Sequence, residues 1–265
     1  MDDGLNLSYE EHFRSHRPDG RYVCSVAALM AQLRDMKPTL ALPENLTKES
    51  FATWQQNVKD TLWRHLAMPE PTPQPAPVKL ETHQRDGYRV ERWEFSPDDY
   101  CAVPFLVMIP DEATEENKVP GVLCYLGSGA NKEFVCDEPC DQHPNRDGGK
   151  YPERNKMGLH MVRNGMAAFV FENPGTAESS ILTPPELGTT HMYTRTVLCH
   201  GLLEMGRNYV GYTVFQRLQF LNWMDMFPFV DQTKMGISSH SLGTEAAIAV
   251  GLLDPRMWSF SLCEA

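Results

Sequence analysis

The sequence contains no apolar run long enough to cross a bilayer. A membrane-spanning helix needs roughly 18 consecutive apolar residues, whereas the longest candidates here are short segments such as AAFVF at 167–171. The first residues, MDDGLNLSYEEHF, also lack the basic and apolar regions of a signal peptide. Taken as written, the sequence predicts a soluble, cytoplasmic chain, and a leader removed before residue 1 would leave the same pattern.

Positive charge is scarce. The 265 residues include 24 Lys and Arg against 35 Asp and Glu, a formal net charge of -11. Binding to nucleic acid requires a basic face that neutralises phosphates, so we expect no such partner. The balance of 42% hydrophobic and 22% charged residues is that of an ordinary globular protein.

Paired cysteines are lacking as well. The seven cysteines are an odd number, scattered through a chain too long to depend on a disulfide framework. Cys136, Cys140 and His143 lie close in sequence, but three ligands without paired spacing do not define a zinc site. We therefore expect no metal and no cofactor, and interpret this segment as a surface loop, with a local disulfide as the alternative.

Two helical patterns precede a proline-rich spacer. Segments 20–36 and 48–68 have apolar residues at helical spacing, and Thr47 is placed to cap the second helix. Prolines at 69, 71, 73, 75 and 77 exclude helix and favour extended chain. The sequence thus predicts an N-terminal helical arm over 1–68, a spacer over 69–77 and a body over 78–265.

The body alternates strands and helices. Two strands flank the Asp86-Gly87 turn, a third follows at 101–110, and apolar runs closed by glycine at 119–129 and 166–175 are typical of strands buried on both faces of a sheet. An antiparallel hairpin followed by β-α-β units is the order of an α/β-hydrolase fold. The sequence predicts a mostly parallel sheet of this class, cut off at about its sixth strand.

The helices of the body follow from the same patterning. Segment 151–165 suits a helix that ends at Gly165. Segment 212–227 places a set of apolar side chains on one helical face, which we expect to pack on the sheet. These are Val214, Leu218, Leu221 and Met224.

The segment Ser239-His240-Ser241-Leu242-Gly243 lies between a predicted strand and a small-residue helix. The G-x-S-x-G nucleophile elbow exposes a serine at such a turn, with small outer residues where strand and helix pass closely. Ser239 replaces the first glycine by another small residue. Strand before and helix after make Ser241 a candidate nucleophile, which needs a base to remove its proton.

An oxyanion hole requires two backbone N–H groups aimed at the developing charge. Leu242, directly after the nucleophile, is one candidate, and Gly127 or Ser128 in the loop YLGSGANKE is the second. A phosphate-binding loop is excluded because no GK[ST] follows these glycines.

Four segments together carry a family resemblance: YLGSGANKE, GMAAFVFENPGTAES, the stretch from Gly206 to Ala246, and LLDPRMWSFSLC. They resemble bacterial α/β hydrolases of the acetyl xylan esterase-like kind, which are related to dienelactone hydrolases and carbohydrate esterases. The resemblance covers roughly 78–263 and implies a serine carboxylic-ester hydrolase acting on acyl groups of plant polysaccharides or similar small esters. In such families the acid follows the sixth or seventh strand and the histidine the eighth.

The acid and the base are not evident. Glu264, 23 residues after the nucleophile at a strand end, is a candidate acid, with a solvated charge as the alternative. No histidine follows Ser241. His240 adjoins it, but neighbouring side chains diverge at an elbow, so we interpret His240 as a turn residue beside the site. His191 and His200 are candidate pocket residues or structural histidines.

Three further polar residues have two interpretations each. Glu172 and Asn173 follow a strand at the active edge of the sheet, where they either line the pocket or hold the loop through backbone hydrogen bonds. We interpret Arg207 as ion-paired beneath the site in preference to binding substrate.

Two functions remain open at this stage. The first is an esterase whose remaining catalytic residues lie beyond this sequence. The second is a catalytically inactive module that binds an ester, a glycan or, at the open edge of the sheet, a partner or second copy of the chain.

Overall fold

The computed structural model describes residues 13–139, 155–181 and 191–263, with the side chains of 191–193 excepted. The chain divides into two compact units, Met1–Val58 and Lys59–Ala265. Helix α3 (Lys48–Leu66) runs from the first unit into the second. Among these residues no helix is long and apolar enough to cross a membrane.

The first unit contains α2 (Ser25–Asp35) and the beginning of α3. Thr47 caps α3 as predicted, since its Oγ1 accepts a hydrogen bond from the N–H of Ser50 at 3.2 Å. Within the same unit the indole of Trp54 donates to the carbonyl of Leu40 at 3.0 Å. This bond ties α3 to the segment that precedes it.

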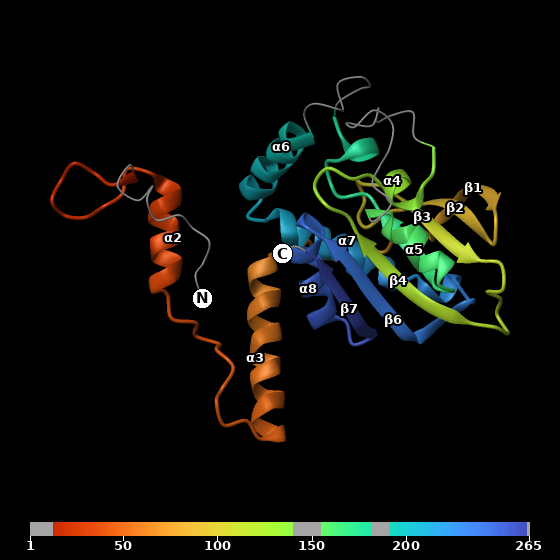
Figure 1. Ribbon diagram of the computed structural model, residues 1–265, viewed down its shortest axis with the longest axis horizontal. Coiled ribbons are helices and arrows are strands. Elements are labelled where there is room, and N and C mark those ends of the chain that lie inside the picture. Colours follow the sequence, from red (N-terminus) through yellow and green to blue (C-terminus); the bar gives the residue numbers. More distant parts are fainter. Residues whose placement is uncertain (1–12, 140–154, 182–190, 264–265) are drawn as a thin grey trace. The chain divides into compact units, whose positions relative to one another are not determined.

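The second unit is built on a seven-stranded sheet of order β1-β2-β3-β5-β4-β6-β7 (Figure 1). The strands are β1 (Val78–Arg85), β2 (Tyr88–Phe95), β3 (Val103–Pro110), β4 (Val119–Tyr125), β5 (Ala167–Phe171), β6 (Val230–His240) and β7 (Met257–Cys263). The pairs β1–β2, β2–β3 and β3–β5 are antiparallel, and β4 pairs in parallel with both β5 and β6, as does β6 with β7. The predicted α/β fold, with antiparallel strands first, is confirmed.

The hairpin turns where the sequence predicts it. Gly87 has φ +80°, a conformation that costs glycine little and other residues more, and Arg85 pairs with Tyr88 on either side of the turn. This hairpin adds β1 outside β2. With this additional strand the sheet has seven strands, although the sequence was expected to end near the sixth strand of the hydrolase order.

The two faces of the sheet are covered by different helices (Figure 1). On one face α7 (Tyr209–Leu221) and α8 (Leu242–Leu253) cover alternate strand residues such as Phe105, Phe169 and Ile237. On the other, α4 (Lys132–Cys136) and α5 (Met157–Arg163) cover the intervening residues, such as Met108 and Val170. Strands β3 and β5 are buried along their whole length because both faces are covered.

The predicted helix features of the body are also present. In α7, Val214, Leu221 and neighbouring Met224 are buried in the core with Leu218 packed against them. Gly165 terminates α5 in a left-handed conformation, φ +74°, and its N–H donates to the carbonyl of Val162. Helix α6 (His191–Glu204) precedes α7.

Candidate active site

Ser241 lies at a strained turn between β6 and α8. Its backbone has φ 48° and ψ -123°, a conformation that non-glycine residues adopt only where the surroundings enforce it. The enforcing contacts include hydrogen bonds on both sides, from the N–H of Ser241 to the carbonyl of Cys263 at 2.9 Å and from the N–H of Thr244 to the carbonyl of Ser241 at 2.8 Å. The turn has the form of a nucleophile elbow.

The hydroxyl of Ser241 is available for chemistry. The residue is half-buried, and its side chain does not cap α8. Within the part of the chain that the structure describes, the hydroxyl makes no hydrogen bond. No described histidine is therefore bonded to it.

The two small residues of the elbow motif, Ser239 and Gly243, are each accommodated for a different structural reason. A Cβ on Gly243 would lie 2.6 Å from the carbonyl carbon of Tyr125, so only glycine fits where α8 passes the end of β4. Ser239 can replace the first glycine because its hydroxyl is satisfied. It lies 3.2 Å from Thr244 Oγ1 and donates to the carbonyl of Ser261 at 3.4 Å.

The loop after β4 lies against the elbow. A Cβ on Gly127 would lie 2.5 Å from Nδ1 of His240 and 3.6 Å from Cβ of Ser241. Across the described residues, the N–H groups of Gly127 and Ser128 donate no hydrogen bond. Leu242 is the first residue of α8, where N–H groups have no partner inside the helix. The structure thus places Gly127, one of the residues expected to supply an N–H donor, next to Ser241 and the start of α8.

A cavity of about 140 Å³ lies beside this loop. Its walls include Gly127, His240, Met157 and the carboxyl ends of β6 and β7. His240 is half-buried, lines this cavity and lies close to Gly127. Its interpretation as a turn residue beside the site stays a prediction.

Asn173 supports the loop after β4 through hydrogen bonds to its backbone carbonyl groups. Its Nδ2 donates to the carbonyl of Leu126 at 2.8 Å and to that of Gly127 at 3.4 Å. The side chain is 2% exposed, so it lies in the interior of the protein and not on a pocket wall. Of the two interpretations from sequence, loop support is the one that the contacts favour.

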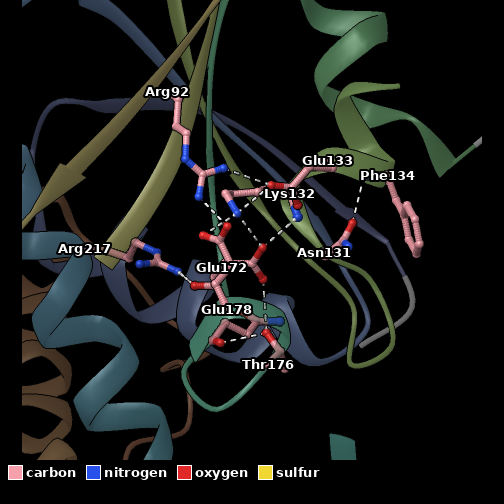
Figure 2. Close-up of polar contacts among 10 residues, drawn as sticks. Arg92, Asn131, Lys132, Glu133, Phe134, Glu172, Thr176, Glu178 and Arg217 are labelled. Carbon is pink, nitrogen blue, oxygen red and sulfur yellow. Dashed lines mark hydrogen bonds and ion pairs between the residues drawn. The ribbon is translucent and has the colours of Figure 1, made fainter. Parts of the chain in front are cut away.

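Glu172 belongs to a buried ion cluster directly beneath this loop (Figure 2). Lys132 Nζ lies 2.6 Å from Glu133, 3.2 Å from Glu172 and 3.0 Å from Glu178. Arg92 closes the cluster by pairing with Glu133 and with Glu178. The exposed fraction is 0% for Lys132 and 1% for Glu172.

The cluster carries more negative than positive charge. Two cations, Lys132 and Arg92, face three carboxylates, and burial raises the pKa of Glu172 to about 7 against the opposing effect of Lys132. Burial would lower the pKa of Lys132, but the carboxylates together raise it above its ordinary value. The two pKa shifts are consistent if the Lys132 ammonium stays charged and the Glu172 carboxyl takes up a proton as pH falls.

Arg217 is the buried arginine of this region. Its guanidinium donates to the backbone carbonyl of Glu172 at 2.7 Å and lies over the ring of Phe171 at 4.4 Å. Burial lowers the pKa of Arg217 to about 10. Arg207, which we expected to be ion-paired beneath the site, is half-buried and forms no ion pair within the described residues. The expectation of an ion pair at Arg207 is therefore wrong. Arg217, the arginine that is buried, binds a backbone carbonyl and aromatic rings and not a carboxylate, and sequence does not show which of the two arginines is enclosed in this way.

None of the other residues singled out from sequence is seen in this arrangement, because each lies elsewhere in the structure or outside the described residues. His200 is exposed on α6, His191 begins α6 with its side chain outside the described residues, and Glu264 lies outside them altogether. Cys136 is buried, while Cys140 and His143 also lie outside the described part. The cysteines that the structure describes are free thiols, and in the described residues no group of three or more His, Cys, Asp or Glu side chains is arranged so that it could hold a metal ion.

Lys132 was not identified from sequence. The signal was present, because Lys132 follows a glycine-containing loop at the carboxyl edge of the sheet, where Glu172 and Asn173 also lie. A lysine next to a glutamate is ordinarily a solvated surface pair, and only the tertiary structure shows that both are enclosed.

The fold and this site define an α/β hydrolase with a serine elbow. Residues 8–264 match the model of the Abhydrolase family, and the chain belongs to that family. No curated protein matches the chain.

Among solved structures, the chain is similar to a protein from Bacteroides fragilis NCTC 9343 provisionally described as an acetyl xylan esterase. The identity is 34%, the TM-score is 0.78, and the match covers 94% of this chain and 62% of that one. The chain therefore spans less than two thirds of this relative.

Two further structures are similar in fold alone. One is a methylesterase, with 15% identity, a TM-score of 0.55 and coverage of 82% of this chain and 42% of that one. The other is a glucuronoyl esterase from Solibacter usitatus, with 13% identity, a TM-score of 0.53 and coverage of 83% and 59%.

Proposed function

We propose that the protein is a serine carboxylic-ester hydrolase that removes acetyl or similar acyl groups from carbohydrate. The observation that carries this proposal is the elbow itself: Ser241 is held at φ 48° next to Gly127, and neither its hydroxyl nor the N–H of Gly127 has a hydrogen bond to any residue that the structure describes. The carbohydrate substrate is supported by the 34% identical relative described as an acetyl xylan esterase.

The chemistry would proceed in two steps. Ser241 Oγ attacks the ester carbonyl carbon, its proton passes to a base, and the alcohol leaves with a proton to give an acyl-serine. Water then attacks the acyl-serine, releases the acid and restores the hydroxyl. In each step the carbonyl oxygen becomes an oxyanion, which the N–H groups of Leu242 and of Gly127 or Ser128 would stabilise.

The base and acid are not assigned among the described residues. Glu264 remains our candidate for the acid, and His191 and His200 remain candidates for contact with substrate. Because no described group accepts the proton of Ser241, a second function also has support: a hydrolase-like module that binds an ester or glycan without turning it over.

A comparison of this chain with its Ser241→Ala variant separates the two functions. Hydrolysis of p-nitrophenyl acetate and release of acetate from acetylated xylo-oligosaccharides would be measured for both, with folding checked by circular dichroism. Turnover that disappears in Ser241→Ala supports the esterase. Equal, background turnover in two folded proteins, with binding of the oligosaccharide retained, supports the binding module.

A further inference from the structure

We infer that Asn173 is a positioning residue that fixes the direction of the oxyanion-binding N–H groups after β4. This inference rests on the proposed function, because it assigns a role within that same site. It concerns the contacts between two loops, the one after β4 and the one after β5.

The geometry of the peptide unit connects Asn173 to the N–H groups. In a trans peptide the C=O and the following N–H point in opposite directions within one plane. Nδ2 of Asn173 binds the carbonyl oxygens of Leu126 at 2.8 Å and Gly127 at 3.4 Å. The N–H groups of Gly127 and Ser128 therefore point away from Asn173, and a Cβ on Gly127 would lie 3.6 Å from Cβ of Ser241.

The Leu126 carbonyl needs this partner, whereas the Gly127 carbonyl also accepts a hydrogen bond from the N–H of Ala130 at 3.2 Å. Leu126 is buried, and a buried carbonyl without a hydrogen bond costs about 1–3 kcal/mol. Glycine at 127 has no side chain to restrict rotation of the adjacent peptide planes. Without Asn173, the peptide plane between Leu126 and Gly127 would be free to rotate toward another donor, and the N–H of Gly127 would change its direction.

Asn173 is itself held in place by the chain around it. Thr176 Oγ1 donates to the Asn173 carbonyl at 2.7 Å, Arg217 donates to the Glu172 carbonyl at 2.7 Å, and the hydroxyl of Tyr209 donates to the Pro174 carbonyl at 3.0 Å. Three consecutive carbonyls of the loop after β5 are thus each bound by a side chain.

The ion cluster joins the same two loops a second time. Lys132 belongs to the segment after β4 and Glu172 to the segment after β5, and Glu172 accepts hydrogen bonds from both the backbone N–H and the Nζ of Lys132, each at 3.2 Å (Figure 2). The loop after β5 therefore acts as a rigid base on which Asn173 orients the loop after β4.

Asn173→Ala and the isosteric Asn173→Asp test this role. Asn208→Ala is the matched control, because Nδ2 of Asn208 also binds two consecutive carbonyls, those of His65 and Leu66, at 2.9 and 3.1 Å. Loss of an oxyanion donor raises the free energy of the transition state and leaves ground-state binding of substrate unchanged. We expect both Asn173 variants to lower kcat for p-nitrophenyl acetate by about 10- to 100-fold with KM nearly unchanged, and Asn208→Ala to lower thermal stability only.

A second readout does not depend on turnover. A hydrogen bond to the Leu126 carbonyl polarises the peptide that contains the Gly127 N–H, so the ¹H–¹⁵N resonances of Gly127 and Ser128 should shift in the Asn173 variants and stay in place in Asn208→Ala. Unmoved resonances would overturn the inference, as would folded Asn173 variants whose kcat equals that of Asn208→Ala. If the parent shows no Ser241-dependent turnover, the proposed function fails, while the resonances still decide the role of Asn173.

Discussion

Gly243 and Tyr125 are in backbone contact across the junction of α8 with β4. A Cβ on Gly243 would lie 2.6 Å from the carbonyl carbon and 2.7 Å from the carbonyl oxygen of Tyr125. These are backbone atoms, which cannot move aside as a flexible side chain can. The contact sets how closely the first turn of α8 approaches the loop that begins at Leu126.

Gly243→Ala should therefore separate the elbow from that loop. We expect a loss of about 1–3 kcal/mol in the free energy of unfolding, the usual cost of overpacking, together with loss of any Ser241-dependent turnover. Gly201→Ala is the control, because Gly201 lies within α6 with no atom within 4 Å of its added Cβ. This control should gain up to about 1 kcal/mol, since alanine favours helix. Urea denaturation would measure both, and equal stabilities would contradict the argument.

The strain at Ser241 predicts an unusual ranking of variants. At φ 48° and ψ -123° glycine is tolerated better than alanine. We expect Ser241→Gly to be more stable than Ser241→Ala by about 1 kcal/mol, although neither has a nucleophile. At Ser239, within strand β6, the order should reverse, because glycine weakens a regular strand. Thermal unfolding of the four variants tests this, and an alanine variant more stable than the glycine variant at both positions would show that Ser241 is unstrained.

The fold was predictable from sequence because its signals are local. Alternating apolar strands, the Asp86-Gly87 turn and the glycine at 165 each act through their own neighbours, and each lies where the sequence predicts it. The elbow was predictable for the same reason, since strand, small residue, serine and helix are consecutive in the chain. The structure adds the strained backbone conformation of Ser241, which distinguishes a nucleophile elbow from a chance match to the sequence motif.

The support beneath the site was not predictable in the same way. Lys132 and Glu172 are 40 residues apart, and their ion pair depends on β4 and β5 lying side by side in the sheet. Arg217 was overlooked in favour of Arg207 because its burial depends on Phe171 and Tyr125, which come from two different strands. Local patterns identify residues that act within one element, whereas these residues act between elements.

Removal of Lys132 should be far more damaging than removal of a surface lysine. In Lys132→Met, three carboxylates would be left with Arg92 alone, and breaking a buried ion pair costs about 3–5 kcal/mol. Lys234→Met is the control, because Lys234 pairs with Asp231 at 3.0 Å with its side chain 60% exposed, and such pairs contribute at most about 1 kcal/mol. Urea denaturation at pH 8 would compare the two. Losses of similar size would mean that the cluster is effectively solvated.

The same cluster predicts opposite pH effects for two neighbouring glutamates. The pKa of Glu172 is raised by burial from 4.5 to about 7, so the folded state binds its proton more tightly. Its contribution to stability is complete below about pH 4.5 and is lost as pH rises to about 7. Burial also opposes ionisation of Glu178, but Arg92 and Lys132 lower the pKa of Glu178 below 4.5. Its contribution is present above that pH and is lost as pH falls.

Glutamine substitutions separate these two effects, because glutamine stays neutral at every pH. Relative to the parent, Glu172→Gln should become progressively more stable between about pH 4.5 and 7 and then level off. Glu178→Gln should instead become less stable than the parent as pH rises toward 4.5, and it should stay so above that pH, because it loses a carboxylate that the folded state prefers charged. Urea denaturation from pH 3 to 8 would measure both differences. If the two variants followed the same course with pH, Glu172 would not be the group that holds the extra proton of the cluster.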